Sequence, residues 1–243
     1  MKTLKKIHTG IFRDGGAGAF SKRRFRDRRK KLMAKEGQLI AVTGVPYGPG
    51  GKTTWSYAHS PTYQEPAMMH LTGINQNNVI LLLDPNSKVS DEILFVDTKD
   101  RVMEFWEGVR FGVGDEQSLK EVRSVTGIAD VRDISEFKDV LKERFKKQKK
   151  KKLGTLWLEG IQRGKAVSIK TDHNFDFKQK LEGWLRSWKA PKGALKNIMK
   201  NHFELRLPLD KYDIANARKA QDITNGGYKV MLKNFKSFKN ECQ

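Results

Sequence analysis

Short apolar runs bounded by turn-forming residues are the strongest pattern in the first half of the chain. Val79–Leu83 and Glu92–Val96 are two such runs, and Asp84-Pro85-Asn86-Ser87 between them is typical of a turn. We therefore predict two strands joined by a turn. Gln38–Val45 predicts another buried strand, whereas residues 52–78, which contain two prolines and a glycine, are expected to be irregular.

Apolar residues at helical spacing indicate helices between and after these strands. Ser135–Phe145 is an example, because its apolar residues recur on one face of a helix. Strands that alternate with helices indicate an α/β domain, in which helices cover a sheet. The other predicted helices are 21–32, 99–107, 116–125, 176–188 and 210–232, and two further short strands are predicted at 128–131 and 155–158.

Charge extends this picture, because the 243 residues carry 48 Lys+Arg against 28 Asp+Glu, a net charge of +20. Residues 22–35 and Lys146–Lys152 are the two densest basic clusters. Such clusters can neutralise nucleic-acid phosphates, so weak nonspecific nucleic-acid binding is one prediction. No aromatic platform, zinc-ligand set or recognition helix accompanies either cluster, and Lys146–Lys152 also fits a solvated loop past a helix C-terminus. A basic nucleic-acid-binding protein stays open as an alternative function.

Cysteine content and hydropathy bear on the compartment. Cys242 is the only cysteine, so no intrachain disulfide is expected and the reducing cytoplasm is the predicted location. Val79–Leu83 is the longest apolar run, far short of the roughly 20 residues that span a bilayer, and no membrane association is expected. The basic N-terminus is not followed by an apolar run of about 7–15 residues and does not predict a secretory signal.

A glycine-rich loop, Gly48–Thr54, follows the first predicted strand and partly matches a phosphate-binding loop. Lys52 would contact the phosphates, and Asp84 at the end of a buried strand would hold Mg²⁺. However, Pro46 stands at the first glycine position of that motif, where it fixes φ and offers no backbone N–H. A surface loop rich in turn residues is the simpler interpretation, and a P-loop-like NTPase is the second alternative function.

Histidines and nucleophiles form no recognisable active site in the sequence. The histidines are scattered, without an i, i+4 pair or a His-Glu-x-x-His motif, and they do not predict a metal site. They are His8, His59, His70, His173 and His202. The residues alone indicate a basic cytoplasmic α/β domain and assign neither a catalytic residue nor a metal ligand.

Four residues spaced as Trp-x-Gly-x-Arg-x-Gly carry a more specific signal: Trp106, Gly108, Arg110 and Gly112. With Leu71-Thr72-Gly73-Ile74-Asn75 and the apolar strand that follows it, they resemble the N-terminal (creatinase/prolidase-type) domain of the Xaa-Pro aminopeptidases, the aminopeptidase P family. The resemblance covers about residues 20–145 and 200–235. Gly73, within the second motif, supplies a turn that feeds the buried strand.

Some positions of this sequence depart from the family's pattern. The resemblance also implies a division of the chain into three parts. Tyr63 stands where the family usually has Arg, and Met68-Met69-His70 replaces an aromatic pair. The tail resembles the linker and the first helix that open the family's catalytic domain. The division that follows is a basic leader at 1–19, an aminopeptidase P N-terminal-like domain at 20–200, and a linker with the first helix of a truncated catalytic domain at 201–243.

The resemblance implies a mixed β-sheet flanked by helices. It also implies that the residues for the family's reaction lie outside this chain. In the family, two Asp, one His and two Glu of a pita-bread domain hold two divalent ions, usually manganese, that activate water. None of these ligands can be assigned here. We therefore expect no cofactor in this chain and no activity of the chain alone, and whether it takes part in catalysis stays open.

The resemblance finally implies a role in subunit contacts and at the entrance of the catalytic cleft. Trp106 and Arg110 are the candidates for that entrance, although packing of Trp106 in the domain and bracing of a turn by Arg110 explain them equally well. Gly73, Gly108 and Gly112 are the motif glycines.

The implied partners are a second copy of the chain or a separately encoded catalytic half. The last helix would then expose an apolar face that self-associates, folds back on its own sheet or binds that half. Its residues are Tyr212, Ile214, Ala217 and Ile223.

Overall fold

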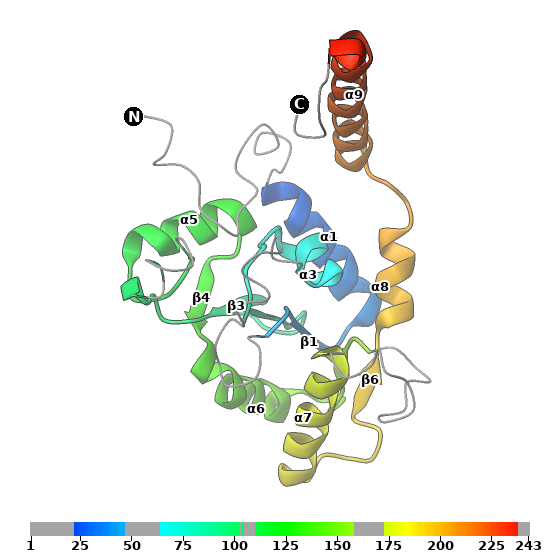
Figure 1. Ribbon diagram of the computed structural model, residues 1–243. Coiled ribbons are helices and arrows are strands. Elements are labelled where there is room, and N and C mark those ends of the chain that lie inside the picture. Colours follow the sequence, from blue (N-terminus) through cyan, green and yellow to red (C-terminus); the bar gives the residue numbers. More distant parts are fainter. Residues whose placement is uncertain (1–21, 47–63, 103, 105–109, 158–172, 238–243) are drawn as a thin grey trace.

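A six-stranded mixed sheet forms the centre of the protein (Figure 1). The computed structural model describes residues 22–46, 64–102, 104, 110–157 and 173–237. Strand order is β4-β3-β2-β1-β5-β6, and only β2 runs against the others. The strands are β1 (Leu39–Thr43), β2 (Ile80–Leu83), β3 (Glu92–Val96), β4 (Asp130–Asp133), β5 (Leu153–Thr155) and β6 (Leu195–Asn197).

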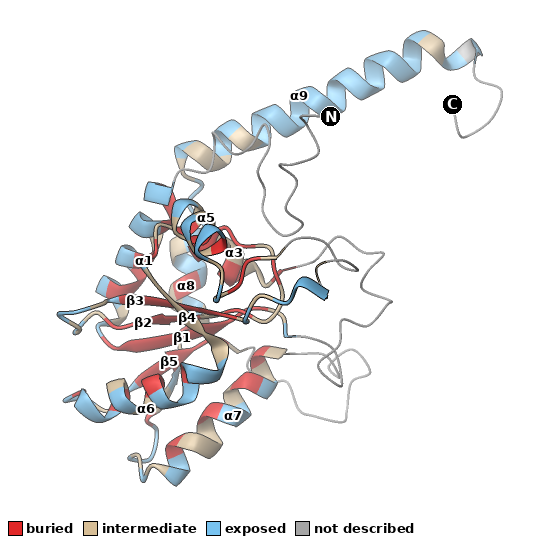
Figure 2. Cartoon of the chain, turned by 90° about the vertical axis from the view of Figure 1, so that its left-hand side faces the viewer, coloured by how far each residue is buried: buried red, intermediate tan, exposed pale blue. Residues whose placement is uncertain are grey.

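Helices cover both faces of this sheet, as Figure 2 shows. α1, α3, α5 and α8 lie on one face, and α6 and α7 lie on the other. The predicted α/β fold with a mixed sheet between helices is confirmed. The helices are α1 (Lys22–Glu36), α3 (Pro66–Thr72), α5 (Glu116–Thr126), α6 (Phe137–Lys147), α7 (His173–Ser187), α8 (Met199–Arg206) and α9 (Lys211–Asn234), with short 3₁₀ turns at Ile134–Glu136 and Phe235–Ser237.

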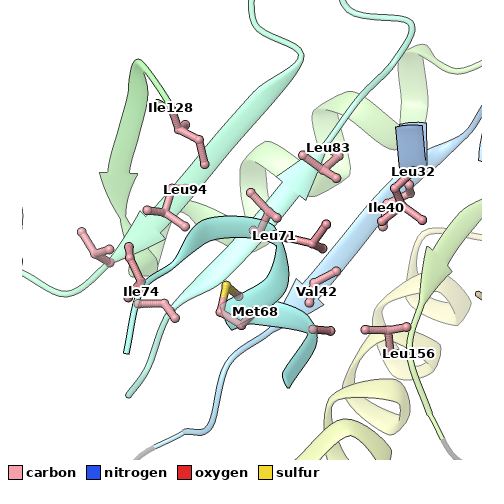
Figure 3. Packing of buried hydrophobic residues seen from close by; sticks show 14 of the residues in the cluster. Leu32, Ile40, Val42, Met68, Leu71, Ile74, Leu83, Leu94, Ile128 and Leu156 are labelled. Carbon is pink, nitrogen blue, oxygen red and sulfur yellow. The ribbon is translucent and has the colours of Figure 1, made fainter. Parts of the chain in front are cut away.

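Side chains alternate between the two faces of the sheet, as the two-residue period of a strand requires. In β1, Ile40 and Val42 join the core under α1 and α3, whereas Leu39 and Ala41 join the core under α6 and α7. All four are fully buried. Figure 3 shows the first core, where Leu71 of α3 lies over the strands. The continuous apolar run in the sequence therefore marks a strand covered on both faces.

One buried arginine ties the helices of the first layer to one another. Arg29 of α1 is completely buried. Its guanidinium donates to the carbonyls of Leu71 (2.8 Å) and Thr126 (3.0 Å), and it pairs with the Glu92 carboxylate at 2.8 Å. α1 is thus joined to the ends of α3 and α5 and to the start of β3. Part of the first basic cluster is therefore internal structure and not surface charge.

The strands predicted at 38–45, 79–83 and 92–96 are confirmed as β1, β2 and β3. The turn between the last two is closed by a hydrogen bond from the Ser87 N–H to the Asp84 carbonyl, at 3.0 Å. The strand predicted at 155–158 was placed too late, because β5 ends at Thr155.

The expectation of irregular structure at 52–78 is wrong for α3, a seven-residue helix. Pro66 suits its first turn because the fixed φ of proline is helical, and the Glu65 carboxylate accepts a hydrogen bond from the first turn. Gly73 ends the helix in the left-handed region, at a φ of 75°. The two residue types that suggested irregularity therefore mark the beginning and the end of a short buried helix.

No helix in the described ranges is long and apolar enough to cross a bilayer.

Candidate functional site at the carboxyl edge of the sheet

The carboxyl ends of β1, β3, β4, β5 and β6 lie at the same edge of the sheet, because these five strands run in one direction. In open α/β sheets, ligands and partners are bound outside this edge. The described segments that leave it include residues 97–102, Glu104, residues 110–115 and the entry to α7, and their polar side chains make up the candidate site.

Two buried glutamines fix the backbone at this edge. The Gln64 carboxamide oxygen accepts hydrogen bonds from the N–H groups of Val45 (2.9 Å) and Glu65 (2.8 Å), and its nitrogen donates to the Gln76 carbonyl. The Gln76 carboxamide in turn accepts from the Phe111 N–H (2.8 Å) and donates to the Phe111 carbonyl (2.9 Å). The two side chains thus join the end of β1, the start of α3 and the segment at 110–113.

Gly112 sits where no side chain fits. Val113 and the end of β3 pair through hydrogen bonds from Val113 N–H to the Asp97 carbonyl and from Lys99 N–H to the Val113 carbonyl, both 2.9 Å. A Cβ added at Gly112 would lie 2.7 Å from the Lys99 nitrogen and 2.9 Å from the Asp97 oxygen. The Gly112 N–H also donates to the Ser118 hydroxyl at 2.9 Å. This motif glycine is therefore required by a close backbone approach.

A lysine between two carboxylates lies beside Arg110. The Lys99 ammonium is 3.3 Å from Glu104 and 3.1 Å from Asp115. Burial opposes the charged form of Lys99, but the hydrogen bonds from its ammonium to both carboxylates outweigh burial and raise the pKa of Lys99. The Glu104 carboxylate also accepts the Arg110 N–H at 2.8 Å. Lys99 thus remains a cation that braces the segment, and it is unsuited to act as a base.

A third contact links this edge to α7. The Glu65 carboxylate lies 2.9 Å from the His173 imidazole and accepts a hydrogen bond from Asn174 at 3.0 Å. Burial favours the neutral form of Glu65, but these hydrogen bonds outweigh it and lower the pKa of Glu65. The residue that caps α3 therefore also positions the first turn of α7.

A second polar cluster lies where the chain enters α9. Arg28 of α1 donates to the carboxylates of Asp210 (2.6 Å) and Asp213 (2.8 Å), and Arg24 pairs with both of them. Asp210 and Asp213 also form a capping box at the start of α9. Burial raises the pKa of Asp210, but its hydrogen bonds and the arginine charges hold the pKa below its usual value. This cluster orients α9.

A histidine pair lies beneath the same entry. The rings of His70 and His202 meet edge to face, with centroids 5.3 Å apart. They border a pocket of about 50 Å³, which Arg28 and Asp210 also line. Burial, together with the charge of Arg28, lowers the pKa of His70 to about 3, and burial together with the charge of Arg206 lowers that of His202 to about 4. Both rings are therefore neutral near pH 7, and the pocket has room for water but not for a substrate.

α9 differs in its burial from the other α-helices whose bounds are given above: none of its 24 residues is buried. It stands away from the sheet in Figure 2. At about 100° per residue, the charged side chains past its first turn gather on one side, and the remaining, wider side is apolar or uncharged. Those charged residues are Arg218, Lys219, Asp222, Lys229 and Lys233; the exposed apolar ones include Ile214, Ile223, Tyr228, Met231 and Leu232.

Residues 25–153 match the sequence model of the aminopeptidase P N-terminal domain, more than half of the chain. The chain belongs to this family. No curated protein is significantly similar to it in sequence.

Solved aminopeptidase P structures share the fold of this family member. Aminopeptidase PepP of Pseudomonas aeruginosa is 19% identical over 80% of this chain, with a TM-score of 0.58. Proline aminopeptidase P II of Yersinia pestis is 18% identical over 84%, with a TM-score of 0.60. Escherichia coli aminopeptidase P, solved with the inhibitor Pro-Leu, is 20% identical over 84%, with a TM-score of 0.58. The chain spans only 40–43% of the length of these proteins.

The predicted site residues of this aminopeptidase P-type domain are only partly within the described structure. Arg110 and Gly112 lie at the carboxyl edge, and Gly73 ends α3. Trp106 and Gly108 lie outside the described residues, as do the leader at 1–19 and the glycine-rich loop Gly48–Thr54.

Sequence reasoning missed the groups that hold this edge together. Gln76, Lys99 and Glu104 belong to no motif that we used, and their partners lie far away in sequence. The Arg28–Asp210 pair was missed for the same reason, because it joins residues 182 positions apart. The one available signal was Gln64, which directly follows Tyr63, the position where the family usually has Arg.

Proposed function

We propose that this domain lines the entrance of an Xaa-Pro aminopeptidase-type catalytic cleft and contributes to subunit contacts. The carboxyl edge supports this role. Its glutamines, together with Lys99 and Glu104, hold the backbone at 110–113 in place, so that Arg110 belongs to a fixed segment. A fixed charged segment suits recognition, because a binding site needs its contacting groups held in place. The observation that carries the proposal is family membership together with this braced Arg110 segment.

The metal chemistry of the family does not fit the residues that the structure describes. Within those ranges, no three His, Cys, Asp or Glu side chains gather so as to hold a metal ion. We therefore derive no catalytic step for them. In this proposal, the divalent ions, manganese in the family, and their ligands belong to a catalytic domain, while the domain described here supplies shape and contacts.

α9 supports docking against such a catalytic unit. Its apolar side is wider than its charged side and is exposed to solvent, which is typical of a helix that packs against a partner. The alternative in which the helix folds back on its own sheet is not the one that the structure adopts. Self-association and a separate catalytic half are the two partners that we propose. The proposal includes a cytoplasmic location, which rests on the single cysteine.

Peptidase assays test the proposal. The purified chain is expected to release no alanine from Ala-Pro, with or without manganese, whereas a complete aminopeptidase P does so under the same conditions. A catalytic domain of this type, prepared without its own N-terminal domain, is expected to gain activity when the chain is added. Arg110→Ala should weaken that gain. Arg186→Ala, which alters an exposed residue of α7, is the matched control and should leave the gain unchanged. Manganese-dependent release by the chain alone would contradict the proposal.

A further inference from the structure

The second basic cluster is only partly a solvated loop. α6 ends at Lys147, and Lys151 folds back so that its ammonium donates to the carbonyls of Phe145 (3.2 Å) and Lys146. Lys152 donates to the Gly193 carbonyl at 2.7 Å. Lys151 thus closes the end of α6, as the expected dipole interaction requires, whereas Lys152 ties the cluster to the turn after α7. Other lysines of the cluster stay exposed to solvent, namely Lys146, Lys147, Lys149 and Lys150.

Two tryptophans from α7 and the turn after it lie beside this cluster. The rings of Trp184 and Trp188 stack with centroids 6.3 Å apart and an angle of 23° between their planes. Trp188 also lies 6.3 Å from Phe145, whose ring carries the Lys151 ammonium at 6.0 Å. The sequence showed no aromatic platform beside this cluster, and the fold brings these aromatic side chains close to it. The aromatic residues are about 40 positions away in the chain and join the lysines only in the fold.

The turn that follows α7 brings further cations to the same surface. It is tied to the basic cluster by the hydrogen bond from Leu153 N–H to the Ala194 carbonyl, at 2.9 Å. Lys189 and Lys192 of this turn are exposed. Lys189 has a φ of 56°, in the left-handed region that favours glycine, so this position holds a lysine at a conformational cost.

We propose that this surface binds single-stranded nucleic acid. The α6–α7 basic surface, as we define it, consists of Lys146, Lys149, Lys150, Lys189, Trp184 and Trp188. Its lysines would contact the phosphates, and the half-exposed indoles would contact bases. The net charge of +20 adds long-range attraction for a polyanion.

The chemistry favours a single strand over the other polyanions. Only a single strand offers unpaired bases to aromatic rings, whereas a duplex presents phosphates alone to such a surface. An anionic membrane is disfavoured because a membrane-binding helix needs an exposed apolar face to insert, whereas the apolar faces of α6 and α7 are buried in the core. The inference uses neither the carboxyl edge nor α9, so it stands or falls separately from the proposed function.

The test compares two triple variants that remove the same charge from opposite faces of the sheet. Lys146→Gln/Lys149→Gln/Lys150→Gln alters the α6–α7 basic surface, and Arg23→Gln/Arg26→Gln/Lys30→Gln alters exposed residues of α1. Binding of a labelled oligouridylate of about 20 nucleotides is followed by fluorescence anisotropy between about 50 and 300 mM salt.

The first variant is expected to lose about 10-fold or more in affinity at about 100 mM salt, and to reduce the log–log salt slope by about 2. The α1 variant should lose less than about 3-fold. An equal loss in both variants would mean that net charge alone drives binding, and it would overturn the proposal. No loss in either variant would do the same.

Two further variants are expected to fold normally and still to bind less tightly, so that a folding defect cannot explain the loss of binding. Lys189→Gly is expected to raise the thermal unfolding midpoint, because glycine suits the left-handed position, and still to weaken oligouridylate binding about 2- to 3-fold. Trp188→Phe retains an aromatic contact to Phe145 and should weaken binding of the oligouridylate but not of a duplex of equal length. Equal affinity of the unaltered protein for duplex and single strand would overturn the role of the indoles. Tighter binding to anionic phospholipid vesicles than to oligouridylate would show that the surface binds membranes, and it would overturn the proposal.

Discussion

α8 and α9 follow one another in the chain but are stabilised in different ways. α8 is only eight residues long, yet it packs on α1 and buries His202 to 4% exposure. α9 is three times as long, buries none of its residues, and is joined to the domain by the Arg24 and Arg28 pairs at its first turn. The described residues up to the end of α8 thus bury a core of their own, whereas α9 carries an apolar side that the described chain leaves uncovered.

Folding stability and association should therefore depend on different helices of this chain. Substitutions in the helix layer around α8 should change the free energy of unfolding. Substitutions on α9 should change association and leave unfolding almost unaffected.

Arg29→Ala should cause the largest loss of stability, about 3–5 kcal/mol, because it leaves Glu92 buried without its cation and two carbonyls without their donor. Arg26→Ala, on the exposed side of the same helix, should stay within about 0.5 kcal/mol. Urea denaturation of both variants measures this. Similar losses for the two variants would show that burial of Arg29 does not matter.

Acid should destabilise the layer around α8 through the histidine pair. The folded pKa values of about 3 for His70 and about 4 for His202 lie below the ordinary value of 6.5. The unfolded chain therefore binds more protons, and stability that is complete above pH 6.5 falls as the pH drops toward these values. Between pH 7 and pH 5 we expect a loss of about 1–2 kcal/mol per histidine.

The control for this pH dependence is His202→Phe. It keeps a ring opposite His70 and removes one titrating group, so the loss between pH 7 and pH 5 should roughly halve. Urea denaturation at the two pH values measures it. An unchanged slope would contradict the assignment to His202.

Gly73→Ala should cost about 2–3 kcal/mol, because the position has a φ of 75° and an added Cβ would lie 2.4 Å from the Phe25 ring. Gly37→Ala is the matched control: its φ is 61°, but nothing lies within 4 Å of the added atom. We expect about 1 kcal/mol there, from backbone conformation alone. Thermal unfolding separates the two costs, and equal losses would show that the contact with Phe25 relaxes freely.

Ile223→Ser on α9 should have the smallest effect on unfolding, within about 0.5 kcal/mol, because Ile223 is 68% exposed. Ile40→Ser in the buried core of β1 is the contrasting variant and should lose several kcal/mol. Urea denaturation measures both. A large loss for Ile223→Ser would show that α9 is part of the core after all.

The sequence was sufficient for β1, β2 and β3, but it placed β5 too late, predicted no strand at β6 and did not reveal the contacts between the strands. Runs such as Val79–Leu83 are recognisable because a strand covered on both faces must be continuously apolar. α3 was missed because its start and end use Pro66 and Gly73, which also occur in loops. A seven-residue helix is stabilised by packing that a local pattern does not record.

The candidate site shows the same limit. Motif spacing pointed to Arg110 and Gly112, but it did not reveal that Gln76 and Lys99 hold them in place. Nor could it place Trp188 beside Phe145, since the two are separated by α7 and much intervening chain. Side-chain contacts between distant segments depend on the register of the sheet, which only the complete fold determines.

The most direct test of the account is the molar mass of the protein in solution, measured by light scattering at about 50 and 500 mM salt. We predict a mass above that of one chain, or a complex with an added aminopeptidase P catalytic domain, that persists at the higher salt because the contact through α9 is apolar. Ile223→Ser/Met231→Ser should abolish the association while the unfolding midpoint stays unchanged. A protein that remains a single chain at every concentration, binds no catalytic domain and behaves identically in the double variant would contradict the account.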